Sequence, residues 1–99
     1  MAFFTVRVEL HQAGDAEYKR LDEAMTKAGY RRIVTSDEGV VFQLPSGEYD
    51  LVAEGTAQQV MEHAYRFAIG VKPSPEPSIM VTQASHRAWN LPIVRRTKA

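Results

Sequence analysis

The chain has 99 residues, with 12 basic and 12 acidic residues and a formal net charge of +0. This length suits one domain and excludes a pair of domains with an active-site cleft between them. A balanced charge gives no overall field that attracts nucleic acid or an anionic membrane, so any such binding requires a local patch. Hydrophobic residues make up 44% and charged residues 24% of the chain, which is typical of a sequence that folds.

The chain contains no cysteine. Disulfide bonds, thiolate catalysis and zinc sites built on sulfur are therefore excluded. The N-terminal sequence has no basic leader followed by an apolar stretch, and no window approaches the ~20 apolar residues that span a bilayer. We therefore expect a cytoplasmic protein with no membrane segment, and nothing in the sequence indicates a cofactor.

The first half of the chain predicts a strand, a helix and a hairpin. Apolar residues alternate over residues 4–10, which indicates a strand that is buried on one face. Asp15 is expected to cap a helix with apolar residues at every third or fourth position, and Gly29 is expected to end it. Two β-rich runs, residues 33–35 and 40–44, flank a turn of Ser, Asp, Glu and Gly and predict a hairpin.

In the second half, residues 45–47, which read Pro-Ser-Gly, interrupt the β-rich pattern. After this interruption, residues 49–53 either extend the hairpin beyond a bulge or form a short extra strand. Thr56 and Gln59 have the spacing of a capping box, which predicts the start of a second helix, and Gly70 is expected to end this helix.

Residues 78–84 are the last main strand that the sequence predicts, after a proline-rich extended connection. The order strand, helix, strand, strand, helix, strand predicts an α+β domain over residues 1–86 with the ferredoxin-like βαββαβ topology. In this fold, four antiparallel strands form one sheet in the order 4-1-3-2, and both helices cover one face. The expected core contains Val6, Val8, Leu21, Met25, Val60 and Ala64.

Residues 87–99 are expected to form a partly docked C-terminal tail. Its apolar part contains Trp89, Leu91, Ile93 and Val94, and its basic end contains Arg95, Arg96 and Lys98. We expect the apolar part to cover an open sheet edge or to form a dimer contact, because an exposed edge accepts an added strand. An open edge and an apolar tail together predict a homodimer, and the basic end is expected to fray.

The segment over residues 28–49, AGYRRIVTSDEGVVFQLPSGEY, resembles the GhoS family of small bacterial antitoxins from type V toxin–antitoxin systems. With the opening strand and both helices in the same order, the resemblance extends to about Ala84. It implies a ferredoxin-like fold similar to the small CRISPR-associated nuclease-like subunit, and an endoribonuclease that cleaves the messenger RNA of a membrane-damaging toxin. Family members carry basic residues on the first helix. Lys19 and Arg20 match this pattern, whereas Asp22 stands where a second basic residue is expected.

RNA cleavage needs a base for the 2′-hydroxyl, an acid for the leaving oxygen and a cation for the phosphorane. His11 follows the first predicted strand and His86 follows the last, so these are the candidate proton-transfer groups. The alternative for each is a solvated loop side chain. His63 lies on the polar side of the second helix and receives no catalytic role. The acidic residues near strand ends are explained as caps, turns and exposed strand positions, so we expect no metal site.

The candidate RNA-binding residues are Arg7, Lys19, Arg20, Arg31 and Arg32. Arg7 lies on the outer face of the first predicted strand, where arginines of other strands can join it to hold a phosphate backbone. Tyr30 or Phe42 can provide a ring on which a base stacks. The alternative for each charge is ordinary surface. The leading hypothesis is an antitoxin-like protein that binds single-stranded RNA, with cleavage left open. The alternative is a catalytically inert module that binds or inhibits a protein partner through the sheet edge and the apolar tail.

Overall fold

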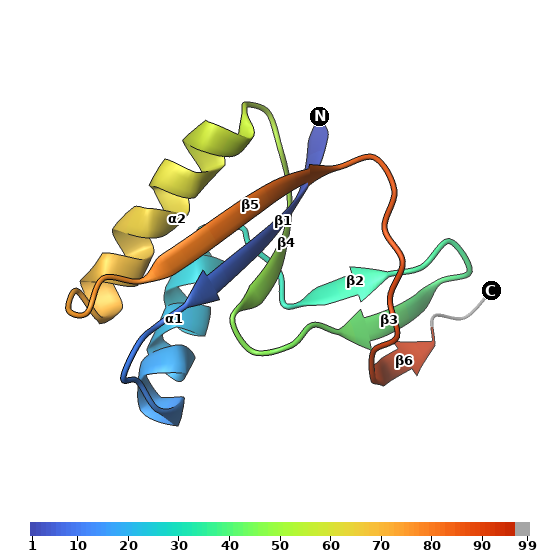
Figure 1. The fold of residues 1–99 in the computed structure, drawn as a ribbon. Helices are drawn as coiled ribbons and strands as arrows, with labels where there is room; N and C mark the ends of the chain where they lie inside the picture. The colour runs from blue at the N-terminus through green and yellow to red at the C-terminus, as the bar shows by residue number, and fades with distance from the viewer. Residues whose placement is uncertain (97–99) are drawn as a thin grey trace.

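The computed structural model describes residues 1–96. In chain order (Figure 1), the elements are β1 (Ala2–Glu9), α1 (Asp15–Lys27), β2 (Ile33–Thr35), β3 (Val40–Gln43), β4 (Glu48–Ala53), α2 (Ala57–Val71), β5 (Ser78–Ala84) and β6 (Ile93–Arg96). The predicted helices and the last main strand are thus present near their expected bounds. Lys98, part of the predicted basic end, lies outside the described residues.

The strands form two three-stranded sheets, in the orders β4-β1-β5 and β2-β3-β6. All four pairings are antiparallel. The two helices pack on one face of the first sheet, and the second sheet lies beside the first, away from the helices (Figure 1). The face of the first sheet opposite the helices is therefore not covered by a helix.

The prediction of a ferredoxin-like βαββαβ domain, with one four-stranded sheet in the order 4-1-3-2, is wrong. β1 pairs with β4, in a register that places Phe4 opposite Leu51, and on its other side with β5. Within residues 1–96, the backbone pairing between the hairpin segment and β4 is limited to the bridge from Arg31 to Asp50. The physical reason lies at Gly47, which has a left-handed φ of +82° and whose carbonyl accepts a hydrogen bond from the Val8 amide at 2.7 Å. The chain therefore leaves the hairpin and returns to β1 as a new strand.

The core lies between the helices and the first sheet. It is built from alternate residues of β1 and from the inward faces of the helices, because strand side chains alternate and helical ones recur every three or four positions. The six predicted core residues all belong to it: Val6, Val8, Leu21, Met25, Val60 and Ala64. Val34, Val40 and Val41 of the hairpin are also buried, outside this core.

The start of α1 differs from the prediction by one residue. The N-cap is Gly14, and Asp15 is the first helical residue. The Gly14 amide donates to the carboxylate of Glu17 at 2.8 Å, so the side chain three residues into the helix takes the capping role. Gly29 follows the helix with φ +99°, as expected of a residue that ends a helix in the left-handed conformation.

The predicted capping box of α2 is confirmed. The Gln59 amide donates to Thr56 Oγ1 at 3.1 Å, and the Thr56 amide donates to Gln59 Oε1 at 2.9 Å. The helix continues past Gly70 to Val71, because Gly70 keeps a helical backbone. Within residues 1–96, neither helix combines the length and the apolar character that are needed to cross a membrane.

Candidate nucleic-acid interface

The face of the first sheet opposite the helices carries polar, charged and apolar side chains in rows across the strands. Directly paired residues of antiparallel strands point to the same side of a sheet. We call this surface the open face, and its residues are Phe3, Thr5, Arg7, Glu48, Asp50, Val52, Met80 and Thr82, with Arg31 beside Asp50. Phe3 is 51% exposed, which leaves an aromatic ring available to solvent on the central strand.

Two arginines of the open face are free of ion pairs. Arg7 and Arg31 are exposed, and neither forms a side-chain hydrogen bond or ion pair with any residue in the range 1–96. Glu48 lies opposite Arg7 in the register, but the two do not form an ion pair. Both guanidinium groups therefore have donors available for an external anion such as phosphate.

The segment that joins the two sheets, residues 85–92, passes the open face, and we call it the strap. The guanidinium Nη1 of Arg87 donates to Oδ1 of Asp50 at 2.8 Å, and Asp50 is only 7% exposed. Arg87 also lies 5.9 Å from the centre of the Trp89 ring. Trp89 packs edge-on against Phe42 of β3, with ring centres 5.6 Å apart. The strap thus makes contacts with both sheets.

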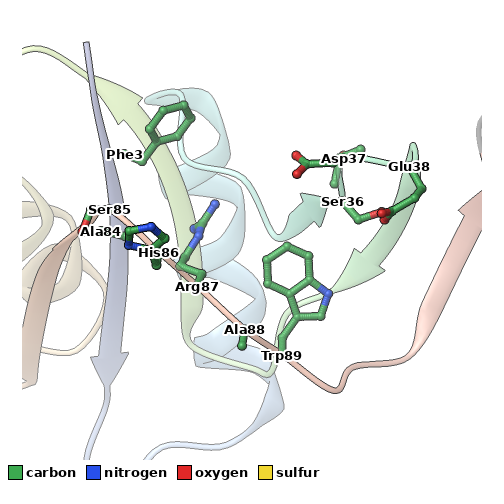
Figure 2. Close-up of a pocket in the computed structure, with 11 residues that line it drawn as sticks. Phe3, Ser36, Asp37, Glu38, Ala84, Ser85, His86, Arg87, Ala88 and Trp89 are labelled. Atoms are coloured by element: carbon green, nitrogen blue, oxygen red, sulfur yellow. The ribbon is translucent and has the colours of Figure 1, made fainter.

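A hollow of about 650 Å³ lies between the first sheet, the strap and the β2–β3 turn. Figure 2 shows Phe3 and His86 on the side of the first sheet, Asp37 and Glu38 on the turn opposite them, and Trp89 on the strap. The volume of the hollow is in the range of small-molecule sites. The hollow therefore brings aromatic rings, an imidazole and two carboxylates to one place.

The two candidate histidines lie at opposite ends of β5. His86 lines the hollow just after the end of β5, whereas His11 Nε2 is 2.8 Å from the Ser78 hydroxyl at its start. β5 has seven residues, and at ~3.3 Å per residue its ends are about 20 Å apart. Within one copy of the chain, His11 and His86 therefore cannot act as acid and base on the same phosphate.

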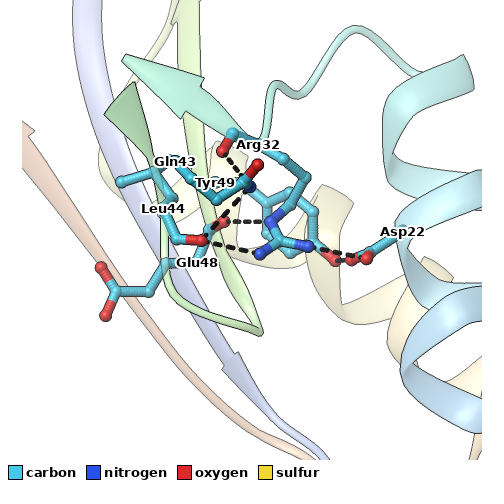
Figure 3. A network of polar contacts seen from close by, with 6 residues as sticks. All are labelled: Asp22, Arg32, Gln43, Leu44, Glu48 and Tyr49. Atoms are coloured by element: carbon cyan, nitrogen blue, oxygen red, sulfur yellow. Dashed lines mark hydrogen bonds and ion pairs between the residues drawn. The ribbon is translucent and has the colours of Figure 1, made fainter. Parts of the chain in front are cut away.

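Arg32 is engaged inside the protein. Its Nη1 donates to Oδ2 of Asp22 at 2.7 Å, its Nη2 to the Leu44 carbonyl at 2.8 Å and its Nε to the Glu48 carbonyl at 3.1 Å (Figure 3). Tyr49 donates its hydroxyl proton to the other oxygen of Asp22. This network joins α1, the hairpin and β4, so all three nitrogens of the Arg32 guanidinium are already used.

The tyrosines beside this network are buried. Burial raises the pKa of the Tyr49 hydroxyl well above its ordinary value, and the hydrogen bond to Asp22 raises it further. Burial also raises the pKa of Tyr30 to about 12, and its hydroxyl lies 2.9 Å from Nδ1 of His63. Tyr30 is only 1% exposed, so its ring presents no face to a base.

The remaining predicted cations, Lys19 and Arg20, are exposed on α1, in the helical layer behind the first sheet. The structure thus brings Arg7 and Arg31 onto one surface and keeps Lys19, Arg20 and Arg32 away from it. Sequence reasoning missed Phe3, although its alternation with Phe4 places it on the same side as Arg7. It also missed Arg87 and Trp89, whose position depends on the path of the strap. No cluster of three or more potential metal ligands occurs within residues 1–96.

The fold and this surface define a small α+β domain with one sheet face under two helices and the other face open and partly basic. Residues 1–85 match the sequence model of a family described as Endoribonuclease GhoS. The chain therefore belongs to the GhoS family, as the resemblance of residues 28–49 indicated. Searches among curated proteins and among solved structures gave no significant match. His86, Arg87 and Trp89 lie just beyond the residues that match the family.

Proposed function

We propose that this protein binds single-stranded RNA on its open face and cleaves it, in keeping with the endoribonuclease name of its family and the antitoxin role that the resemblance implies. The observation that carries the proposal is the joint display of Phe3, Arg7 and Arg31 on one exposed sheet surface. Single-stranded RNA is typically bound by aromatic side chains that stack on bases and by cations that hold the phosphates.

The open face suits this role better than the helical side. A strand that lies flat on one surface cannot also contact the layer behind it, so Lys19 and Arg20 cannot join Arg7 and Arg31 on the same stretch of RNA. The helical side near Arg20 includes Glu23 and Lys27, and its aromatic ring, Phe67, is partly buried against the core, whereas Phe3 is 51% exposed. The proposal therefore assigns the RNA to the open face.

His86 is the proton-transfer group in this proposal. It lies at the edge of the open face beside Phe3, whereas His11 lies at the far end of β5 with Ser78. The imidazole accepts the proton of the 2′-hydroxyl, the 2′-oxygen forms a bond to phosphorus, and the bond from phosphorus to the 5′-oxygen breaks. The leaving 5′-oxygen takes a proton from water, and the product strand ends in a 2′,3′-cyclic phosphate. Arg31, beside Asp50, stabilises the charge on the phosphorane. Arg7 lies opposite Met80, six residues before His86, and holds a phosphate farther along the RNA.

Binding can be tested by fluorescence anisotropy of a labelled single-stranded RNA over a series of salt concentrations. Each phosphate contact contributes about 0.7 to the slope of log affinity against log salt. We expect Arg7→Ala and Arg31→Ala each to lower the slope by about 0.7, whereas Arg20→Ala, the matched control on α1, leaves it unchanged. If Arg20→Ala lowers the slope and the other two variants do not, the RNA binds the helical side and the proposal fails.

Cleavage is tested separately with an end-labelled RNA whose products are resolved on a gel. We expect His86→Ala to abolish cleavage while RNA binding remains, and His11→Ala to retain cleavage. A 2′-deoxy substitution at the cut position should block the reaction, because the attacking oxygen is then absent. Full cleavage by His86→Ala would remove this residue from the mechanism.

A second function, a catalytically inert module that binds a protein partner, is favoured by one observation. Ile93 and Val94 of β6 are 52% and 46% exposed at the edge of the second sheet, where an added strand can pair. The two functions differ in the anisotropy experiment. RNA binding that is absent even at low salt would leave the protein-binding module as the better account.

A further inference from the structure

The hollow beside the strap differs in chemistry from the rest of the open face. Phe3 and Trp89 contribute aromatic rings to its lining, and the Trp89 ring is held in place by Phe42 on one side and by the Arg87 guanidinium near it. Arg87 is in turn fixed by its ion pair with the buried Asp50. The ring is therefore positioned before any ligand arrives, which lowers the entropic cost of binding.

The charges around the hollow argue against a phosphate and in favour of a base. Arg87 is already neutralised by Asp50, while Asp37 and Glu38 line the opposite side (Figure 2) and form no ion pair within residues 1–96. Two carboxylates repel a phosphate group. They attract N–H donors, because an ionised carboxylate only accepts hydrogen bonds.

The four RNA bases differ in the donors that they offer to a carboxylate. Guanine presents two adjacent donors, the ring N1–H and the exocyclic amino group, which match the two oxygens of one carboxylate. Adenine and cytosine present an amino group next to a ring nitrogen that is an acceptor, and uracil presents one N–H between two carbonyl oxygens. Guanine therefore forms the most hydrogen bonds when a base stacks on an aromatic ring with its edge toward Asp37 and Glu38.

We propose that the hollow is a binding site for one unpaired guanine of the RNA, with the base stacked on Trp89 and its Watson–Crick edge toward the carboxylates of Asp37 and Glu38. This inference rests on the proposed RNA-binding function and adds a sequence preference to it. The RNA backbone then runs from this guanine along the open face toward Arg31 and, farther along β1, toward Arg7. Arg87 and Trp89 lie beyond the residues that match the family, so the stacking ring of this site comes from the C-terminal segment, and its carboxylates come from the matched part of the chain.

The single tryptophan of the chain provides a direct readout, because a base that stacks on the indole quenches its fluorescence. The probes are a short oligouridylate and versions of it with one central guanine, adenine, cytosine or inosine, each also carrying a label for anisotropy. We expect the guanine probe to bind at least about fivefold more tightly than the others, as for one bidentate contact to a base, and to quench Trp89 most strongly. Inosine lacks the exocyclic amino group and should lose most of this preference.

Two variants test the role of the carboxylates. Asp37→Asn combined with Glu38→Gln should reduce the guanine preference to within about twofold while the oligouridylate still binds. Glu62→Gln, at an exposed site on α2, is the matched control and should keep the preference. If all probes bind equally and Trp89 is not quenched, this inference fails while the proposed function stands. If no probe changes the anisotropy, the proposed function fails as well.

Discussion

Asp22 on α1 accepts hydrogen bonds from side chains of two other elements. Its two oxygens face the Arg32 guanidinium and the Tyr49 hydroxyl, and Arg32 also reaches the carbonyls of Leu44 and Glu48. The basic residue that the family resemblance leads one to expect here would repel Arg32. The acidic residue instead fixes the end of the hairpin against the helical layer, so its role is structural.

Replacing Asp22 with alanine leaves the Tyr49 hydroxyl and one nitrogen of Arg32 without their acceptor. Because these groups are largely shielded from water, we expect a loss of about 1–3 kcal/mol in the free energy of unfolding. Denaturant titration measures this loss. Glu23→Ala, at the exposed neighbouring position, should change the stability by less than about 0.5 kcal/mol. Equal effects of the two substitutions would show that the network adds nothing to stability.

At the scale of elements, Gly47 sets the return of the chain from the hairpin to the first sheet. A β-carbon built on it would lie 2.4 Å from the Val8 carbonyl oxygen, and its φ is +82°. Only glycine adopts this conformation without strain. The residue therefore permits the close approach through which β4 becomes the neighbour of β1.

Two glycine-to-alanine substitutions should have opposite effects on stability. Gly47→Ala should destabilise the protein by about 2 kcal/mol or more, through strain and the clash with the backbone of β1. Gly70→Ala should stabilise it by about 0.5–1 kcal/mol, because Gly70 lies in α2 with nothing near an added β-carbon and alanine is the better helix former. Thermal unfolding followed by circular dichroism compares them. A stable Gly47→Ala protein would refute the role given to this turn.

The elements themselves could be predicted because their signals are local. Periodicity placed both helices and β5, and the capping box placed the start of α2. The sheet pairing could not be predicted, because it depends on the left-handed turn at Gly47 and on a single bridge from Arg31 to Asp50, which no short window reveals. For the same reason, Arg7 and Arg31 were recognisable as surface cations, whereas Arg87 became part of the site only through its contact with Asp50.

At the scale of the whole molecule, β6 is an edge strand of the second sheet. Within residues 1–96 it pairs only with β3, and Ile93 and Val94 are both about half exposed. A second copy can pair its own β6 with this edge, antiparallel and around a two-fold axis, which gives a closed dimer. The homodimer therefore stays a prediction, with β6 as its contact.

Sedimentation velocity over a range of protein concentrations tests this dimer. Val94→Lys should shift the protein toward monomer, because a charge on an edge strand opposes the addition of another strand. Gln83→Lys, at an exposed position on β5, an edge strand of the first sheet, should leave the dimer unchanged. A full-length protein that remains monomeric at high concentration would show that the prediction is wrong.

The position of β1 between β4 and β5 has a consequence for synthesis of the chain on the ribosome. β1 ends at residue 9, whereas β4 begins at residue 48 and β5 at residue 78. At a synthesis rate of ~5–20 residues per second, β5, the second partner of β1, is made roughly 3 to 14 seconds after β1. During that interval an apolar strand has an unpaired edge, which favours association with other nascent chains. Emergence of β5 ends this exposure, so the moment at which it leaves the ribosome sets how long each new chain is prone to aggregate.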